Sequence, residues 1–145
     1  MKTILVTGGS GVLGRALLPA LEGRRGRARP VPPRRLPPRV PAGRPSDRAG
    51  LAEALRGVDT VIHAASQPSR PQADIEMTGV LLAAAREAGV RHVVYVSIVG
   101  CDRVQAFPYY RAKTHSEALV AAGGVPFTWC APRSSMSSWR SCCRA

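Results

Sequence analysis

Apolar and polar positions along the chain define two alternating kinds of segment. Four short apolar runs, bounded by glycine, proline or polar residues, are typical of buried strands in a parallel sheet. These predicted strands cover residues 2–7, 58–65, 91–97 and 125–130. Segments with apolar residues three and four positions apart lie between them and predict helices. The predicted helices cover residues 12–23, 46–57, 73–90 and 109–124.

Strands that alternate with helices predict an α/β fold with a doubly wound, Rossmann-like parallel sheet. In the first helix, five apolar residues share the face that we expect to lie inward. They are Val12, Ala16, Leu17, Ala20 and Leu21. We expect one domain over residues 1–130.

Two segments follow neither period. Residues 24–45 are rich in arginine and hold seven prolines, so we expect an irregular insert. The second and third strands of a Rossmann-like sheet should fall there and are doubtful. The first strand would then be an exposed sheet edge, which invites self-association. We expect residues 131–145 to be an irregular tail. Both segments change composition abruptly, which suggests out-of-frame readings of a GC-rich gene, a hypothesis that the nucleotide sequence would test.

The net charge of +12 suggests a nucleic-acid partner, but its distribution argues against one. Nine arginines and one acid lie between Arg24 and Arg48, and the remaining residues carry a net charge of only +4. This segment has no aromatic residues for base stacking and no helix that could enter a groove. We therefore expect no specific nucleic-acid binding.

The chain also lacks signals for a membrane or a metal. No apolar run reaches the roughly 20 residues that span a bilayer, and the N-terminus does not resemble a signal peptide. The four cysteines form no C-x-x-C motif and have no histidine at metal-ligand spacing. We expect a cytoplasmic protein with free thiols, no metal and no membrane contact.

A glycine-rich loop follows the first strand directly and opens the first helix. Gly8, Gly11 and Gly14 have G-x-x-G-x-x-G spacing. Glycine permits a tight turn, and the missing Cβ lets the backbone approach a pyrophosphate. The N–H groups of the following helix N-terminus can then bind the phosphates. The loop therefore predicts a dinucleotide site, which is supported by its place between a strand and a helix.

A second constellation predicts acid–base chemistry. Ser97 ends the third predicted strand, and Tyr109 and Lys113 form Y-x-x-x-K at the start of the fourth predicted helix. Residues four apart share a helical face, so the Lys113 ammonium can lie near the Tyr109 phenol and lower its pKa. Tyr110 would instead pair with Thr114, which carries no charge. The Ser97 hydroxyl can bind the substrate oxygen.

In this order, the motifs "TGGSGVLG", "GVDTVIHAAS", "LLAAAREAGVRHVVYVSIVG" and "PYYRAKTHSEALV" resemble the short-chain dehydrogenase/reductase superfamily, specifically its NmrA-like or atypical extended branch in truncated form. The resemblance implies a Rossmann fold that binds NAD or NADP. It implies that Ala64, Ala65 and Ser66 line the cofactor, and that Lys113 also contacts the nicotinamide ribose.

The cofactor-binding set that follows from the loop and the resemblance is Gly8, Gly11, Val12, Leu13, Gly14, Ala64, Ala65, Ser66 and Lys113. Arg34 or Arg35 could meet a 2′-phosphate, which favours NADP slightly over NAD. Asp59 and His63 are interpreted as residues that serve the fold.

The function predicted from these residues is an NAD(P)-dependent oxidoreductase domain of the short-chain dehydrogenase type. Tyr109 is the acid/base, Lys113 lowers its pKa, and Ser97 orients a small-molecule substrate that the sequence does not identify. Two alternatives stay open. One is a dinucleotide-binding regulatory or sensor protein without turnover, and the other is a non-functional truncated remnant.

Overall fold

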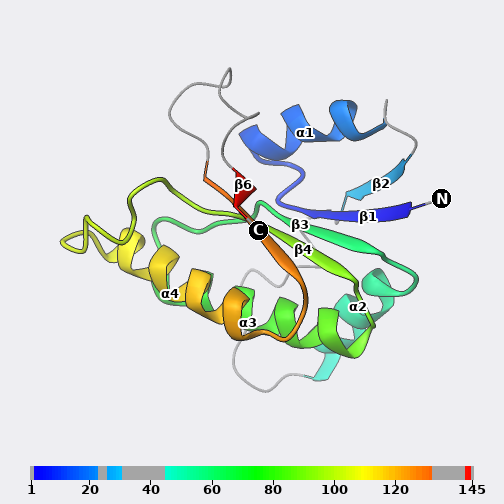
Figure 1. Ribbon diagram of the computed structural model, residues 1–145. Coiled ribbons are helices and arrows are strands. Elements are labelled where there is room, and N and C mark those ends of the chain that lie inside the picture. Colours follow the sequence, from blue (N-terminus) through cyan, green and yellow to red (C-terminus); the bar gives the residue numbers. More distant parts are fainter. Residues whose placement is uncertain (1, 23–25, 31–44, 132–142, 145) are drawn as a thin grey trace.

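The computed structural model describes residues 2–22, 26–30, 45–131 and 143–144. Its strands are β1 (Lys2–Thr7), β2 (Gly26–Pro30), β3 (Thr60–His63), β4 (His92–Val96), β5 (Phe127–Cys130) and β6 (Cys143–Arg144). Its helices are α1 (Val12–Glu22), α2 (Pro45–Leu55), α3 (Pro71–Glu87) and α4 (Pro108–Ala122). The described strands form one sheet in the order β2-β1-β3-β4-β5-β6. Helix α1 lies on one side of this sheet, and α2, α3 and α4 lie on the other (Figure 1).

This arrangement confirms the predicted α/β, Rossmann-like fold class. Strands β1, β3, β4 and β5 fall within the four apolar runs of the sequence, and neighbouring members pair in parallel. The register aligns Leu5 with Val61 and Val61 with Val93. All three are buried and form the sheet side of a core that α2, α3 and α4 cover. Parallel strands end at the same edge, so the loops that follow them come together there.

The expectation that residues 24–45 are irregular throughout is wrong at both ends. Gly26–Pro30 forms β2, which pairs in parallel with β1, and Pro45 begins α2. Proline disrupts a ladder in a strand interior, but β2 has its single proline at its last residue and lies at the end of the described sheet. The second strand is therefore present. The predicted loss of the third falls on residues 31–44, outside the described residues.

Strand β1 is consequently not the exposed edge that the sequence suggested. It pairs with β2 on one side and with β3 on the other. The argument for self-association through β1 therefore loses its basis.

The tail is also not irregular throughout. Cys143–Arg144 forms β6, which pairs antiparallel with β5. A strand of two residues, with no alternating apolar pattern around it, cannot be predicted from the sequence. We attribute its formation to the backbone groups of β5 that are free to pair at the edge of the sheet. Residues 132–142 and 145 lie outside the described residues.

Helices α3 and α4 both begin with a proline in the first turn, two residues and one residue earlier than predicted. Proline suits this position because its ring presets the helical φ and no N–H partner is needed.

The inward face predicted for α1 is only partly correct. Leu17 and Leu21 are partly buried, but Ala16 and Ala20 are exposed and Val12 is 92% exposed. Val12 lies at the mouth of the glycine loop. In the described part of the chain, no helix is long and apolar enough to cross a membrane.

Candidate cofactor and catalytic site

The glycine loop joins the end of β1 to the start of α1. Gly8 has a φ of +76°, which a residue with a side chain rarely adopts. The Gly11 N–H donates to the Gly8 carbonyl at 2.9 Å and closes the turn. The Arg15 Nε donates to the Ser10 carbonyl at 2.9 Å and holds the outside of the loop. Gly11 and Val12 are exposed, so the N-terminus of α1 is open to a ligand.

Two of the three glycines are required by close packing. A Cβ on Gly8 would lie 2.6 Å from the backbone nitrogen of Ala65, and one on Gly14 would overlap the Gly8 carbonyl oxygen. Gly11 is different, since the nearest atom to its Cβ would be the Gly8 oxygen at 3.3 Å. Gly8 and Gly14 therefore shape the loop, and Gly11 leaves its backbone bare toward the ligand side.

The segment after β3 lies directly against this loop. Its Ala64 N–H donates to the carbonyl of Thr7 at 3.2 Å. Ala64 and Ala65 are partly buried beside Gly8, and Ser66 is exposed. The structure thus brings the predicted glycine loop and the predicted Ala64–Ser66 segment together. Leu13, the remaining residue of this set, is partly buried in the first turn of α1.

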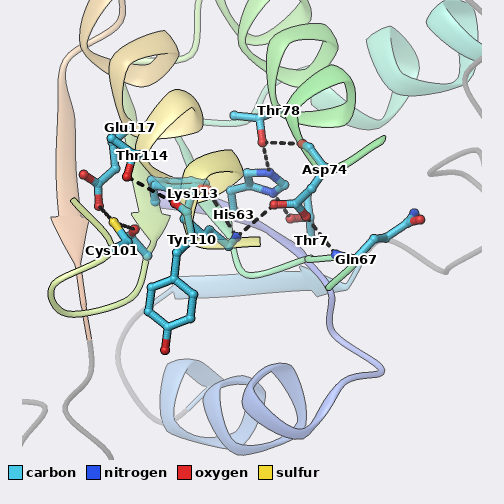
Figure 2. Close-up of polar contacts among 12 residues, drawn as sticks. Thr7, His63, Gln67, Asp74, Thr78, Cys101, Tyr110, Lys113, Thr114 and Glu117 are labelled. Atoms are coloured by element: carbon cyan, nitrogen blue, oxygen red, sulfur yellow. Dashed lines mark hydrogen bonds and ion pairs between the residues drawn. The ribbon is translucent and has the colours of Figure 1, made fainter. Parts of the chain in front are cut away.

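Tyr109 and Lys113 lie one turn apart on α4, as predicted. The Lys113 Nζ is 5.5 Å from the centroid of the Tyr109 ring and 5.1 Å from that of Tyr95. Tyr109 is half-buried, and Ser66, from the segment after β3, is close enough to its phenol to oppose the rise in its pKa. Tyr110 points its phenol away from Lys113 (Figure 2). Of the two neighbouring tyrosines, Tyr109 is therefore the one whose ring lies beside the Lys113 ammonium.

The predicted lowering of the Tyr109 pKa is wrong in this structure. Burial raises the pKa of Tyr109, and the negative charge of Asp74 raises it further, while the hydrogen bond from Ser66 opposes the shift. The physical reason is that Lys113 is engaged elsewhere. Its Nζ lies 3.2 Å from Asp74 Oδ2 and donates to the Tyr95 hydroxyl at 3.2 Å.

Asp74 is the site residue that the sequence analysis missed. Its carboxylate is fully buried on α3, where Oδ1 accepts the Gln67 N–H at 2.8 Å and Oδ2 faces Lys113 (Figure 2). Its position carried a signal, because the buried residues of α3 recur at helical spacing and Asp74 is the first of them. An acid on an apolar helix face needs a partner, since a buried charge is costly without one.

Ser97 follows β4 as predicted, but it takes part in a different cluster. Its side chain is 3% exposed, and its hydroxyl lies 3.8 Å from Cys101 Sγ. Cys101 is a buried free thiol that donates to Glu117 Oε1 at 3.4 Å. Burial raises the pKa of the Cys101 thiol. In this structure the Ser97 hydroxyl is thus directed into the protein.

His63 is a core histidine, as interpreted from its apolar strand. The Thr78 hydroxyl donates to the Asp74 carbonyl at 2.9 Å, so it accepts from His63 Nε2 at 3.1 Å. Nδ1 is then the acceptor of the Thr7 hydroxyl at 2.6 Å. Burial, with the charge of Lys113, lowers the pKa of His63 to about 3, so the ring is neutral.

Asp59 also serves the fold. Its Oδ2 accepts the Thr3 N–H at 2.8 Å, and its Oδ1 lies 3.1 Å from Arg91 NH2. These contacts fix the start of β1 against the turn before β3. Arg34 and Arg35, which the sequence offered as partners for a 2′-phosphate, lie outside the described residues.

A glycine loop between the first strand and a helix N-terminus, at the carboxyl edge of a parallel sheet, defines a dinucleotide-binding domain of the Rossmann type. The sequence matches the NAD(P)H-binding family over residues 8–136, and the chain belongs to that family. The bare backbone at Gly11 and the open N-terminus of α1 fit such a cofactor.

Known proteins similar to this chain agree with this class. A Streptomyces griseus (4-alkanoyl-5-oxo-2,5-dihydrofuran-3-yl)methyl phosphate reductase is 38% identical over 146 residues, which cover 93% of this chain and 49% of the reductase. The structure of Citrobacter sp. triphenylmethane reductase complexed with NADP(H) has a TM-score of 0.72 at 17% identity, over 93% of this chain and 50% of that one. At this identity the likeness shows the fold alone.

A third protein, a short-chain dehydrogenase/reductase superfamily protein from Agrobacterium tumefaciens with bound NAD, has a TM-score of 0.63 at 28% identity. The match covers 89% of this chain and 48% of that protein. The chain thus spans about half the length of the relatives that it matches.

Proposed function

We propose that this chain is the cofactor-binding and proton-donating part of an NAD(P)H-dependent reductase. The observation that carries the proposal is the position of Tyr109. Its phenol is close enough to Ser66, in the segment beside the glycine loop, for Ser66 to affect its pKa, and the Lys113 Nζ lies 5.5 Å from the centroid of its ring. An acid–base group is therefore next to the backbone proposed to line the cofactor.

The contacts suggest which residues would bind the cofactor and which would donate the proton. Gly8, Gly11 and Gly14, with the first turn of α1 and Ala64–Ser66, would hold the dinucleotide, which supplies the hydride when bound. Tyr109 would donate a proton to the oxygen on which negative charge develops as the substrate carbon is reduced. Because burial raises its pKa above the ordinary value of 10.0, Tyr109 is protonated at neutral pH, which suits a donor in the direction of reduction.

The Streptomyces relative indicates the class of substrate. The compound in its name carries a ring double bond conjugated to an oxo group and an alkanoyl group. We propose a carbonyl-activated acceptor of this general kind, in which the oxygen next to Tyr109 becomes an alkoxide or an enolate. We further propose NADP rather than NAD as the cofactor, because β2 and its flanks are rich in arginine.

A dinucleotide-binding protein without turnover is the second candidate. It is favoured by one observation, namely that the Ser97 hydroxyl is directed to Cys101 inside the protein. A reductase of the proposed type would need the Ser97 hydroxyl to orient its substrate. A protein that binds the dinucleotide without turnover would not need it, and the hydroxyl could then serve the contact with Cys101.

Substitution of the two neighbouring tyrosines separates these candidates. In assays of NADPH oxidation with quinone and enone acceptors, we expect Tyr109→Phe to lower kcat by about 10²–10⁴-fold, the usual contribution of a positioned proton donor. Tyr110→Phe is the matched control and should retain most of the activity, because its phenol points away from Lys113. Equal losses in both variants would contradict the role of Tyr109. Tight NADPH binding without oxidation of any acceptor would favour the second candidate.

A further inference from the structure

One buried carboxylate joins two segments of the candidate site. Asp74 is 0% exposed, and its two oxygens have different partners. Oδ1 accepts the backbone N–H of Gln67, in the loop after β3, at 2.8 Å. Oδ2 lies 3.2 Å from the Nζ of Lys113 on α4. Figure 2 shows Asp74 between these two partners, so a single side chain on α3 spans the space between the loop and α4.

The charge on Lys113 explains why an acid is needed at this place. Lys113 is 2% exposed, and its other close neighbours are the Tyr95 hydroxyl at 3.2 Å and the rings of Tyr95 and Tyr109. His63, on β3, is neutral because burial and the charge of Lys113 lower its pKa, and both ring nitrogens are bonded to threonines. Asp74 therefore provides the negative charge that faces the ammonium.

Stability alone does not account for this pair. Replacing a buried ion pair by apolar residues of similar volume is often neutral or stabilising, because desolvation offsets most of the attraction. Here the carboxylate also orders a loop, and the two partners that it fixes are both next to the proposed cofactor. Gln67 directly follows Ser66, and Lys113 lies behind Tyr109.

We propose that Asp74 is a positioning residue that clamps the Ala64–Gln67 loop to Lys113 and so shapes the nicotinamide side of the cofactor site. This inference rests on the proposed function, in which that loop and Lys113 face the cofactor. The glycine loop would hold the pyrophosphate, and the adenosine half would lie beyond it, away from Lys113. Asp74 does not touch the glycine loop in any of the contacts above. Loss of the clamp should therefore affect the two halves of the cofactor differently.

The test compares binding of NADPH with binding of 2′,5′-ADP, which lacks the nicotinamide half. Asp74→Asn keeps an oxygen for the Gln67 N–H but removes the charge that holds Lys113. We expect its Kd for NADPH to rise at least about tenfold, a change of about 1.4 kcal/mol, and its Kd for 2′,5′-ADP to stay unchanged. Glu76→Gln, an exposed acid two residues further along α3, is the matched control and should change neither Kd.

A second variant keeps the test decisive if the uncompensated Lys113 unfolds the protein. Asp74→Ala combined with Lys113→Met removes both charges and the acceptor for the Gln67 N–H. We expect this variant to bind NADPH more weakly than Lys113→Met alone, with the same Kd for 2′,5′-ADP. Wild-type affinity for NADPH in the folded variants would overturn the proposal. Equal weakening of NADPH and 2′,5′-ADP in a folded variant would also overturn it.

Amide exchange in the protein without ligand tests the clamp separately from the cofactor. We expect the Gln67 N–H to exchange at least about tenfold faster in Asp74→Ala, which loses its charge-assisted hydrogen bond, than in Asp74→Asn. Equal exchange rates would contradict the clamp itself. A wild-type chain that binds neither NADPH nor 2′,5′-ADP would contradict the proposed function, while the Gln67 exchange would still decide the role of Asp74.

Discussion

The absence of a side chain at Gly14 decides whether the glycine loop can close. A Cβ there would overlap the Gly8 carbonyl oxygen and approach Gly9, and both neighbours are backbone atoms that cannot rotate away. We therefore expect Gly14→Ala to abolish measurable NADPH binding and to lower the free energy of unfolding by about 1–3 kcal/mol, the usual cost of overpacking. Titration with NADPH and denaturant unfolding would measure the two effects.

Gly79→Ala is the matched control for this change. Gly79 lies within α3, and the nearest atom to its Cβ would be Leu119 Cδ1 at 4.0 Å. Alanine should fit this space and raise the free energy of unfolding by about 0.5–1 kcal/mol, because it favours the helix more than glycine does. A stable Gly14→Ala protein that still binds NADPH would show that the loop is not closed as described.

The neutral His63 predicts how stability depends on pH. The native ring takes up a proton only near its lowered pKa of about 3, whereas the unfolded chain does so below the ordinary value of 6.5. Because the unfolded state binds more protons in this window, stability is lost as the pH falls from 6.5 toward 3. His63 should account for a loss of about 2 kcal/mol between pH 7 and pH 5.

Urea unfolding at the two pH values checks this expectation. His63→Gln should reduce the difference in unfolding free energy between pH 7 and pH 5, whereas His115→Gln, an exposed position on α4, should leave it unchanged. If His63→Gln and the wild-type chain lose the same free energy, His63 is not the buried neutral group described above.

At the scale of single residues, motif spacing pointed to the glycines, Tyr109 and Lys113, and the family resemblance pointed to Ala64–Ser66; their roles stay predictions. The sequence did not predict Asp74, since a charged residue on a helix is usually assigned to solvent and its partner Lys113 is far away in the sequence. It also predicted a lowered Tyr109 pKa from the Y-x-x-x-K spacing. That spacing places the cation near the phenol but does not reveal the acid that faces the cation.

Among the elements, β2 determines whether the backbone amides of β1 are protected from hydrogen exchange on both sides of the strand. Strand β1 has β2 on one side and β3 on the other, so its amide groups should be hydrogen-bonded on both sides. We expect all interior amides of β1 to be protected from hydrogen exchange. Rapid exchange at alternate β1 positions would show that β1 is an edge strand, as the composition of residues 24–45 suggested.

Four strands and four helices were predictable because short, bounded apolar runs and helical periods identify them. Gly26–Pro30 was not, because its sequence lacks a run of apolar residues. It is defined by its parallel pairing with β1. The two-residue β6 likewise has no pattern of its own and is defined by its pairing with β5.

The whole molecule has a Rossmann-type cofactor site, and it spans about half the length of the relatives that it matches. The glycine loop, the Ala64–Ser66 segment and α4 are the elements proposed to bind the dinucleotide, and all three lie within the described part of the chain. The account therefore predicts that this chain binds NAD(P)H as it stands.

Titration of the purified chain with NADPH and NADH, followed by fluorescence and calorimetry, tests this claim most directly. We expect saturable binding at one site with a Kd in the roughly micromolar range, near −8 kcal/mol, and tighter binding of NADPH than of NADH. A folded chain that shows no saturable binding of either cofactor would contradict the account.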